Sequence, residues 1–221
     1  VKARHPVIED FVGASQFVAN DLLMDESSKV LLITGPNMAG KSTVMRQTAL
    51  CVVLAQIGSF VPCEKAVLPL FDNLYTRVGA SDDLSQGLST FMVEMKEASH
   101  ILRHATDKSL VILDEVGRGT STEDGLALAH GILDFIAKKV GSWTLFATHY
   151  HELVEPAESY PTVKLVHTKV LQKKSHIEFT HKLIDGSSGN SYGLEVAKIA
   201  GIPAEVLKLA QNLINQKVTT S

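Results

Sequence analysis

Short apolar runs alternate with helix-forming stretches over the first two thirds of the chain. Three of the runs have the length of a strand and do not alternate between apolar and polar residues. They are Val30–Thr34, Leu110–Leu113 and Thr144–Ala147. Runs of this kind are typical of parallel strands that helices cover on both faces. A fourth strand is expected near Leu74–Val78. The pattern therefore predicts an α/β fold.

Helices are predicted between these runs. Residues 41–57 contain neither Gly nor Pro and are rich in helix formers. A second helix should begin with Ser89 or Thr90 as its N-cap. A third should begin at Ser121, which opens a capping-box-like sequence, and should end at Gly141.

The two ends of the chain show different patterns. Apolar and polar residues alternate at 163–167 and again at 177–181, which predicts an antiparallel pair of strands. Residues 1–29 mix short apolar pieces with turns, and we expect irregular strands there.

A polar stretch at 185–191 is expected to be a linker. Two helices should follow it, at about 194–200 and 204–217, with the break at Gly201-Ile202-Pro203. Pro203 suits the first turn of the second helix. This organisation separates a large unit, residues 1–186, from a helical appendage, residues 187–221.

Composition narrows the class of protein. The chain has 221 residues, of which 45% are hydrophobic, enough for one globular domain with a full core and a small appendage. Its net charge of −3 lacks the basic signature of a nucleic-acid-binding surface. Cys51 and Cys63 show neither metal-ligand nor disulfide spacing, so we expect a reducing compartment and a core position for Cys51. No apolar run could span a membrane, and the start without Met suggests a piece of a longer protein.

The most specific motif lies between the first apolar run and the helix after it. It fits the phosphate-binding pattern G-x-x-x-x-G-K-[S/T] at every fixed position. Its residues are Gly35, Pro36, Asn37, Met38, Ala39, Gly40, Lys41 and Ser42. Backbone N–H groups of such a loop, together with the dipole of the following helix, bind anionic oxygens. Lys41 would reach the β- and γ-phosphates of a nucleoside triphosphate, and the Ser42 hydroxyl would ligate Mg²⁺. A chance glycine-rich turn is the alternative.

Further chemistry follows the other two buried runs. Asp114 and Glu115 end the second run, at the edge where open α/β sheets bind ligands. Asp114 would hold Mg²⁺ directly or through water, and Glu115 would orient or deprotonate an attacking water. A solvated turn is the alternative. His149 follows the third run and could hydrogen-bond a γ-phosphate oxygen and sense its presence, or be structural.

Four strings in the chain resemble the MutS mismatch-repair ATPases. They are the phosphate loop extended to Thr43, the segment Ser89-Thr90-Phe91-Met92-Val93-Glu94-Met95, the segment Asp114-Glu115-Val116-Gly117-Arg118-Gly119-Thr120-Ser121, and the segment Phe146-Ala147-Thr148-His149-Tyr150. The resemblance covers nearly the whole chain. It implies a P-loop ABC-type ATPase sheet flanked by helices, with an antiparallel β element and a C-terminal helix-turn-helix dimerisation element. Residues 1–186 would be the ATPase domain, and ATP or ADP with Mg²⁺ its ligands.

The same resemblance implies roles for residues that the motifs alone leave open. Ser89, at the start of a helix, would contact the γ-phosphate of a nucleotide held by a second subunit. Phe17 matches an aromatic residue that stacks on adenine, and His167 matches a second stacking position. From the residues alone, a core position is the simpler expectation for Phe17, and a place on one face of a strand is the simpler expectation for His167.

Partners and location are also implied by the resemblance. The partners would be a second MutS-type subunit, identical or not, mismatched DNA bound by domains outside this chain, and repair factors of the MutL type, without a membrane. The location would be the cytoplasm or nucleoid of a bacterium, or a eukaryotic nucleus. The alternatives are a MutS paralogue outside mismatch repair, another ABC-type ATPase such as a transporter motor or a chromosome-maintenance head, and a dimerisation module that binds ATP but hydrolyses it poorly.

Overall fold

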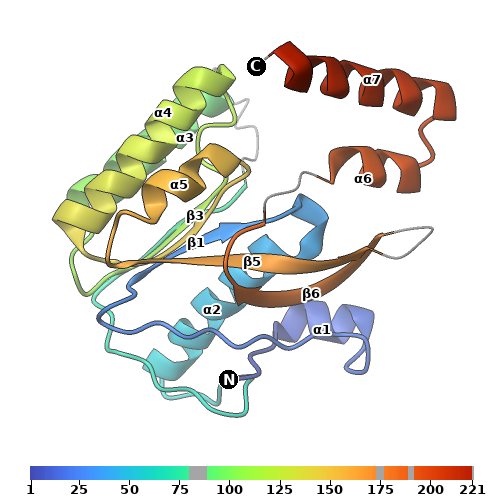
Figure 1. The fold of residues 1–221 in the computed structure, drawn as a ribbon. Helices are drawn as coiled ribbons and strands as arrows, with labels where there is room; N and C mark the ends of the chain where they lie inside the picture. The colour runs from blue at the N-terminus through green and yellow to red at the C-terminus, as the bar shows by residue number, and fades with distance from the viewer. Residues whose placement is uncertain (80–88, 173–176, 189–191, 221) are drawn as a thin grey trace.

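A six-stranded sheet forms the centre of the protein, with strand order β2-β3-β4-β1-β5-β6 (Figure 1). The computed structural model describes residues 1–79, 89–172, 177–188 and 192–220. The strands are β1 (Val30–Thr34), β2 (Leu74–Arg77), β3 (Leu110–Asp114), β4 (Trp143–Ala147), β5 (Val163–Gln172) and β6 (Ile177–Asp185). Neighbours from β2 to β5 are parallel, and β6 runs antiparallel to β5. Every strand predicted from residue 30 onward is confirmed.

Alternate residues of the central strands face two separate cores. Val30 and Leu32 of β1 lie in one core, and Leu31 and Ile33 lie in the other. The first core is covered by α3 (Thr90–His104) and α4 (Thr122–Phe135), and the second by α2 (Lys41–Gln56). Burial on both faces explains why these strands are continuous apolar runs.

Shorter elements complete the helical layers. They are α1 (Pro6–Val12), the 3₁₀ turns Asn37–Ala39 and His151–Leu153, the π-helical turn Ile136–Val140, and α5 (Val154–Ala157). The π-helical turn continues α4 and ends at Gly141, in the left-handed conformation, as the sequence predicts. Ser89 and Ser121 cap α3 and α4 with their side chains, so both predicted caps are confirmed. Cys51 is buried in α2, also as predicted.

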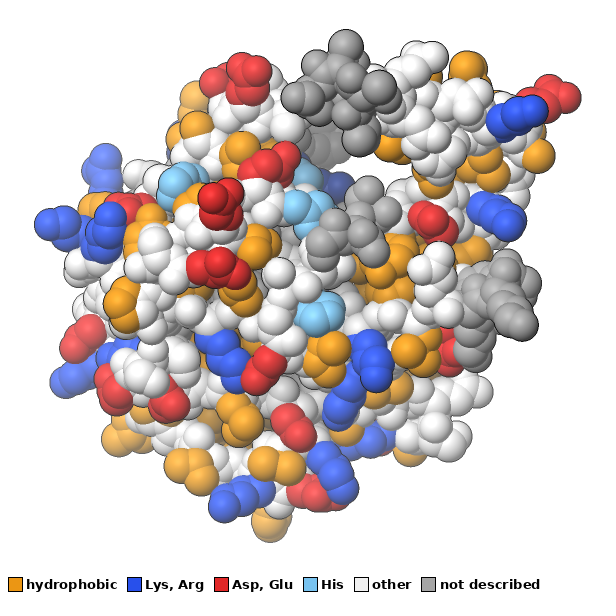
Figure 2. All heavy atoms as spheres, in the orientation of Figure 1, with side chains coloured by type: hydrophobic (Ala, Val, Ile, Leu, Met, Phe, Trp, Pro, Cys, Tyr) orange, Lys and Arg blue, Asp and Glu red, His pale blue; other side chains and the backbone are white. Residues whose placement is uncertain are grey.

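The last two helices form an arm that projects from the sheet (Figure 1). They are α6 (Gly193–Ile199) and α7 (Ala204–Thr220), close to the predicted bounds. Large apolar side chains of the arm are exposed, among them Ile199, Val206 and Leu209, and hydrophobic side chains are visible on it in Figure 2. None of the described helices is long and apolar enough to cross a membrane.

The prediction of irregular strands in residues 1–29, the segment that precedes β1, was wrong. That segment contains helix α1 and, among described pairings, one isolated bridge between Ala3 and Asn20. The His5 ring accepts the N–H of Ile8 at 3.3 Å and Pro6 occupies the first turn, two features that start helices. No residue of α1 is buried, and its seven residues are too few for helical periodicity to reveal it. Part of the predicted linker, residues 189–191, lies outside the described residues.

Candidate active site

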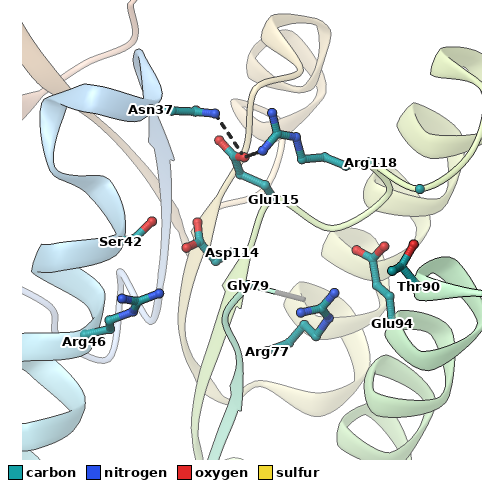
Figure 3. Close-up of a pocket in the computed structure, with 11 residues that line it drawn as sticks. Asn37, Ser42, Arg46, Arg77, Gly79, Thr90, Glu94, Asp114, Glu115 and Arg118 are labelled. Atoms are coloured by element: carbon teal, nitrogen blue, oxygen red, sulfur yellow. Dashed lines mark hydrogen bonds and ion pairs between the residues drawn. The ribbon is translucent and has the colours of Figure 1, made fainter. Parts of the chain in front are cut away.

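The predicted chemistry gathers at one edge of the sheet, where the carboxyl ends of parallel strands meet. β1 leads into the glycine-rich loop, β3 ends in the two acids, and His149 follows β4. Because β4 lies between β3 and β1, the three segments are neighbours. A cavity of about 480 Å³ opens there, and Ser42, Asp114, Glu115 and Arg118 are among the residues that line it (Figure 3).

The loop after β1 needs glycine at both ends. Gly35 has a φ of 121° and Gly40 a φ of 94°, values that residues with a side chain rarely adopt. A Cβ atom on Gly35 would also collide with the hydroxyl of Thr168 on β5. Helix α2 begins directly after Gly40, so its unpaired N–H groups and its dipole favour an anion at the loop.

Lys41, the first residue of α2, is folded into the site and is only 1% exposed. Its ammonium donates to the carbonyl oxygen of Gly35 and, at 3.1 Å, to Oδ1 of Asn37. The Glu115 carboxylate lies 3.4 Å away. Burial lowers the pKa of Lys41, and Glu115 is the largest influence that opposes this. The loop therefore surrounds a buried cation.

Asp114 and Ser42 lie across from each other in the cavity (Figure 3). Burial raises the pKa of Asp114, and a hydrogen bond with the Ser42 side chain opposes that rise. The Oδ1 atom of Asp114 is buried and has no hydrogen-bond partner among the described residues. An unpaired carboxylate oxygen beside a hydroxyl is the donor set that Mg²⁺ prefers, so these two residues fit the predicted metal role.

Glu115 has a φ of 56°, a left-handed conformation that costs a residue with a side chain roughly 1–3 kcal/mol. Its N–H is held by the carbonyl oxygen of Ala147 at 2.9 Å. Arg118 holds one carboxylate oxygen at 2.5 Å, and Asn37 donates to the same oxygen at 3.4 Å. The backbone and three polar partners, including Lys41, therefore fix a carboxylate at the mouth of the loop.

His149 lies beside this cluster, two residues after the end of β4. Its Nδ1 atom is buried and has no partner among the described residues, and its ring lies 4.0 Å from that of Tyr150. Burial lowers the pKa of His149, while the Glu115 carboxylate works in the opposite direction. A neutral imidazole is therefore favoured, and a neutral ring can donate one hydrogen bond and accept another.

Ser89 lies at the exposed start of α3 and is not among the residues that line the cavity. Its hydroxyl accepts the N–H of Met92 at 3.2 Å. The next residue, Thr90, and Glu94 one turn later do line the cavity, opposite Asp114 (Figure 3). The structure therefore confirms Ser89 as a helix cap, and its predicted contact with a second subunit's nucleotide stays a prediction.

A buried hydrogen-bond path that the sequence did not predict links α3 to the other site segments. Glu94 is 4% exposed, and its carboxylate accepts the N–H of Gly117 at 2.9 Å. The carbonyl oxygen of Gly117 in turn accepts the hydroxyl of Tyr150 at 2.9 Å. The turn after Glu115 and the residue after His149 are thus held together, and both are tied to the helix that begins at Ser89.

A second cavity, of about 380 Å³, lies on the other side of the loop. Met38, Gly40 and Thr43 line it, and so does Phe17, at the position that the resemblance assigned to base stacking. The histidine in this cavity is His181 of β6, which has a φ of 53°.

His167, the predicted partner of Phe17, lies elsewhere. It pairs in register with Ile184 and Thr34 on its two neighbouring strands and is absent from the residues that line the second cavity. The structure therefore brings Phe17 together with His181 and not with His167. His181 belongs to a strand that alternation predicts, but its place opposite Phe17 depends on the β5–β6 register.

The fold and the site define a class of protein: an α/β domain in which a lysine-bearing glycine loop, two acids and a histidine meet at the carboxyl edge of a parallel sheet. The sequence model of one family, MutS domain V, matches residues 31–217. The chain belongs to that family.

Individual relatives agree with this assignment. The chain is 53% identical over 211 residues to the DNA mismatch repair protein MutS of Geobacillus kaustophilus, a match that covers 96% of this chain and 24% of the relative. It is 52% identical over 213 residues to MutS of Lactobacillus delbrueckii subsp. bulgaricus, with 96% and 25% covered. MutS of Caldicellulosiruptor bescii is 52% identical over 216 residues, with the same coverage. The chain therefore spans about a quarter of the length of the curated relatives it matches.

Proposed function

We propose that this chain is the ATP-binding and ATP-hydrolysing domain of a MutS-type DNA mismatch repair protein. The observation that carries the proposal is the cluster at the carboxyl edge of the sheet, where the buried Lys41 ammonium lies 3.4 Å from the Glu115 carboxylate beneath the glycine-rich loop. Membership of the MutS domain V family supports it. The same match weighs against a transporter motor or a chromosome-maintenance head.

Lys41 and the loop N–H groups would bind the β- and γ-phosphates of ATP. Ser42 and Asp114 would hold Mg²⁺, which neutralises phosphate charge when bound. The described residues contain no group of three or more His, Cys, Asp or Glu side chains that could hold a metal. The other Mg²⁺ ligands would therefore be phosphate oxygens and water, as is usual for this ion.

Glu115 would orient a water molecule and accept its proton as the water oxygen attacks the γ-phosphorus. The bond between the γ-phosphorus and the bridging oxygen to the β-phosphate breaks, and ADP and phosphate leave. Neutral His149, at the end of the adjacent strand, would donate a hydrogen bond to a γ-phosphate oxygen. Arg118, which holds the carboxylate at 2.5 Å, would fix the orientation of Glu115.

The second cavity would hold the nucleoside part of ATP. Phe17 would stack on the adenine, and His181 replaces His167 as the proposed second stacking residue because it shares the cavity with Phe17. Aromatic and apolar walls with few polar groups are typical of such pockets.

Two copies of the domain, or this one and a related subunit, would complete each site. Ser89 and Thr90, at the start of α3, are exposed, and Ser89 with the first N–H groups of this helix would meet the γ-phosphate held by the partner. The exposed apolar side chains of α6 and α7 support a dimerisation role for residues 187–221 as a helix-turn-helix element, with residues 1–186 as the P-loop ABC-type ATPase domain.

In the whole protein, ATP state would set the geometry of this dimer and so of a clamp on mismatched DNA formed by other domains. Repair factors of the MutL type would act downstream of this clamp. The relatives named above come from bacteria, which supports a cytoplasmic location.

The proposal is tested by measuring Mg²⁺-dependent phosphate release from ATP. Replacing the buried ammonium in Lys41→Met should abolish release, because the phosphates lose their central cation. The same change at the exposed Lys108 is the matched control and should leave release unchanged. Absence of ATP hydrolysis by the unaltered protein, or full activity in Lys41→Met, would contradict the proposal.

A further inference from the structure

One buried polar side chain beside the second cavity takes no part in the proposed phosphate, metal or stacking contacts. Gln47 of α2 is only 1% exposed. Neither its Oε1 nor its Nε2 atom has a hydrogen-bond partner within the described parts of the chain. A buried amide normally finds partners for both atoms, and leaving them unmade destabilises the protein. Such an exception in a cavity wall makes the amide a candidate for contact with a ligand.

The position of Gln47 relates it to a bound nucleotide. It lines the cavity that also contains Phe17 and His181. Thr43 lies one turn earlier on the same face of α2 and lines the same cavity. Gln47 is six residues beyond Lys41, roughly 9 Å along the helix at the usual rise per residue. It therefore lies away from the phosphate end of the site and toward the two aromatic side chains.

We propose that the Gln47 amide hydrogen-bonds the edge of the purine base of the bound nucleotide, and so determines base specificity. This inference rests on the proposed nucleotide-binding function. A carboxamide offers a donor and an acceptor side by side, the pattern that pairs with the exocyclic amino group and an adjacent ring nitrogen of adenine. Phe17 and His181 supply flat faces for the ring, and Gln47 supplies the polar contact that stacking lacks.

A purely structural role for Gln47 makes a different prediction for the protein without nucleotide. If the amide has no protein partner, Gln47→Leu removes a buried unsatisfied group and should leave stability unchanged or raise it. If the amide holds the fold together, the same change should lower stability.

The test compares the affinity of four ligands by isothermal titration calorimetry with Mg²⁺, using products so that hydrolysis does not intervene. The ligands are ADP, purine riboside diphosphate, which lacks the exocyclic amino group, 2′-deoxy-ADP and pyrophosphate. We expect the unaltered protein to bind ADP roughly 5- to 30-fold more tightly than purine riboside diphosphate, the range given by one or two neutral hydrogen bonds. In Gln47→Leu this ratio should fall to about 1, while pyrophosphate affinity stays the same. Gln172→Leu, the same change at an exposed residue of β5 that lines neither cavity, should keep the ratio of the unaltered protein.

Each other outcome has a distinct meaning. An unchanged ratio in Gln47→Leu, or an equal loss of the ratio in Gln172→Leu, would overturn the inference. So would equal weakening of ADP and pyrophosphate, which would place the effect in the fold. Loss of discrimination against 2′-deoxy-ADP alone would assign Gln47 to the ribose and overturn the base contact. If the unaltered protein bound none of the nucleotides, the proposed function itself would fail, and this inference with it.

Discussion

Glu115→Gln replaces one carboxylate oxygen by an amide nitrogen and removes one negative charge, with almost no change in shape. The carboxylate is held by Arg118 at 2.5 Å and lies 3.4 Å from the Lys41 ammonium. In the variant the amide oxygen can still accept a hydrogen bond from either cation. The left-handed backbone of residue 115 does not depend on the charge, so the geometry should persist.

The expected effects of Glu115→Gln on ATP affinity and on the rate of hydrolysis differ in size. Arg118 is 57% exposed, and a pair with such an exposed partner contributes at most about 1 kcal/mol. Lys41 keeps its bonds to Gly35 and Asn37, so we expect a total loss of about 1–2 kcal/mol in unfolding free energy. Loss of a general base slows turnover by roughly 10²- to 10⁴-fold. With a negative charge removed near the phosphates, ATP affinity should be equal or higher.

The assay is single-turnover phosphate release together with equilibrium ATP binding, for the variant and for Glu123→Gln. Glu123 is an exposed acid in the first turn of α4, so its change should alter neither quantity. Release by Glu115→Gln within about threefold of the unaltered rate would refute the general-base reasoning, given the 10²-fold minimum expected. Lost ATP binding would instead show that the carboxylate holds the loop together.

Three further changes test the surroundings of the site. Gly117→Ala puts a Cβ atom 2.6 Å from the Gly125 carbonyl oxygen at a φ of 97°. We expect this change to lower the free energy of unfolding in urea by about 2–3 kcal/mol. The control Gly131→Ala, at a helical glycine with open space around it, should raise the same free energy by about 0.5–1 kcal/mol. Glu94→Ala leaves the buried Gly117 N–H unpaired and should lower the free energy of unfolding by about 1–3 kcal/mol. Glu94→Gln keeps an acceptor and should lower it less, so equal losses in urea unfolding would contradict the hydrogen-bond path. Asp114→Asn should raise thermal stability without nucleotide while removing Mg²⁺-dependent hydrolysis. The folded-state pKa of Asp114 is raised above 3.8, so the charged form opposes folding above that pKa and the gain should shrink as the pH falls toward 3.8; a gain that does not change with pH would exclude this cause.

The strands and the phosphate loop could be predicted because their signals are local. A strand buried on both faces is a continuous apolar run, and a loop that needs glycine at positions 35 and 40 shows both in the sequence. Ser89 and Ser121 could be predicted as N-caps because their signals are also local. Helix α1 was missed because its seven residues are too few for helical periodicity to be distinguished, although His5 and Pro6 carry its start signals.

Features that depend on pairing between distant segments could not be predicted. Which histidine lies opposite Phe17 is set by the antiparallel register of β5 and β6, which shifts between Thr168 and Val170. The path from Glu94 through Gly117 to Tyr150 joins residues 23 and 33 positions apart. Gln47 is unremarkable in sequence, because the apolar and polar positions of a helix do not reveal which polar side chain is buried without a partner.

We infer that this domain hydrolyses ATP at sites that a second copy completes. The most direct test is the rate of phosphate release per chain, measured over protein concentrations that span dimer formation in analytical ultracentrifugation with ATP and Mg²⁺. We expect the rate per chain to rise with the dimer fraction, and we expect Ser89→Ala to lower the plateau without weakening ATP binding to the monomer. A rate per chain that stays constant while the dimer fraction changes would contradict this inference.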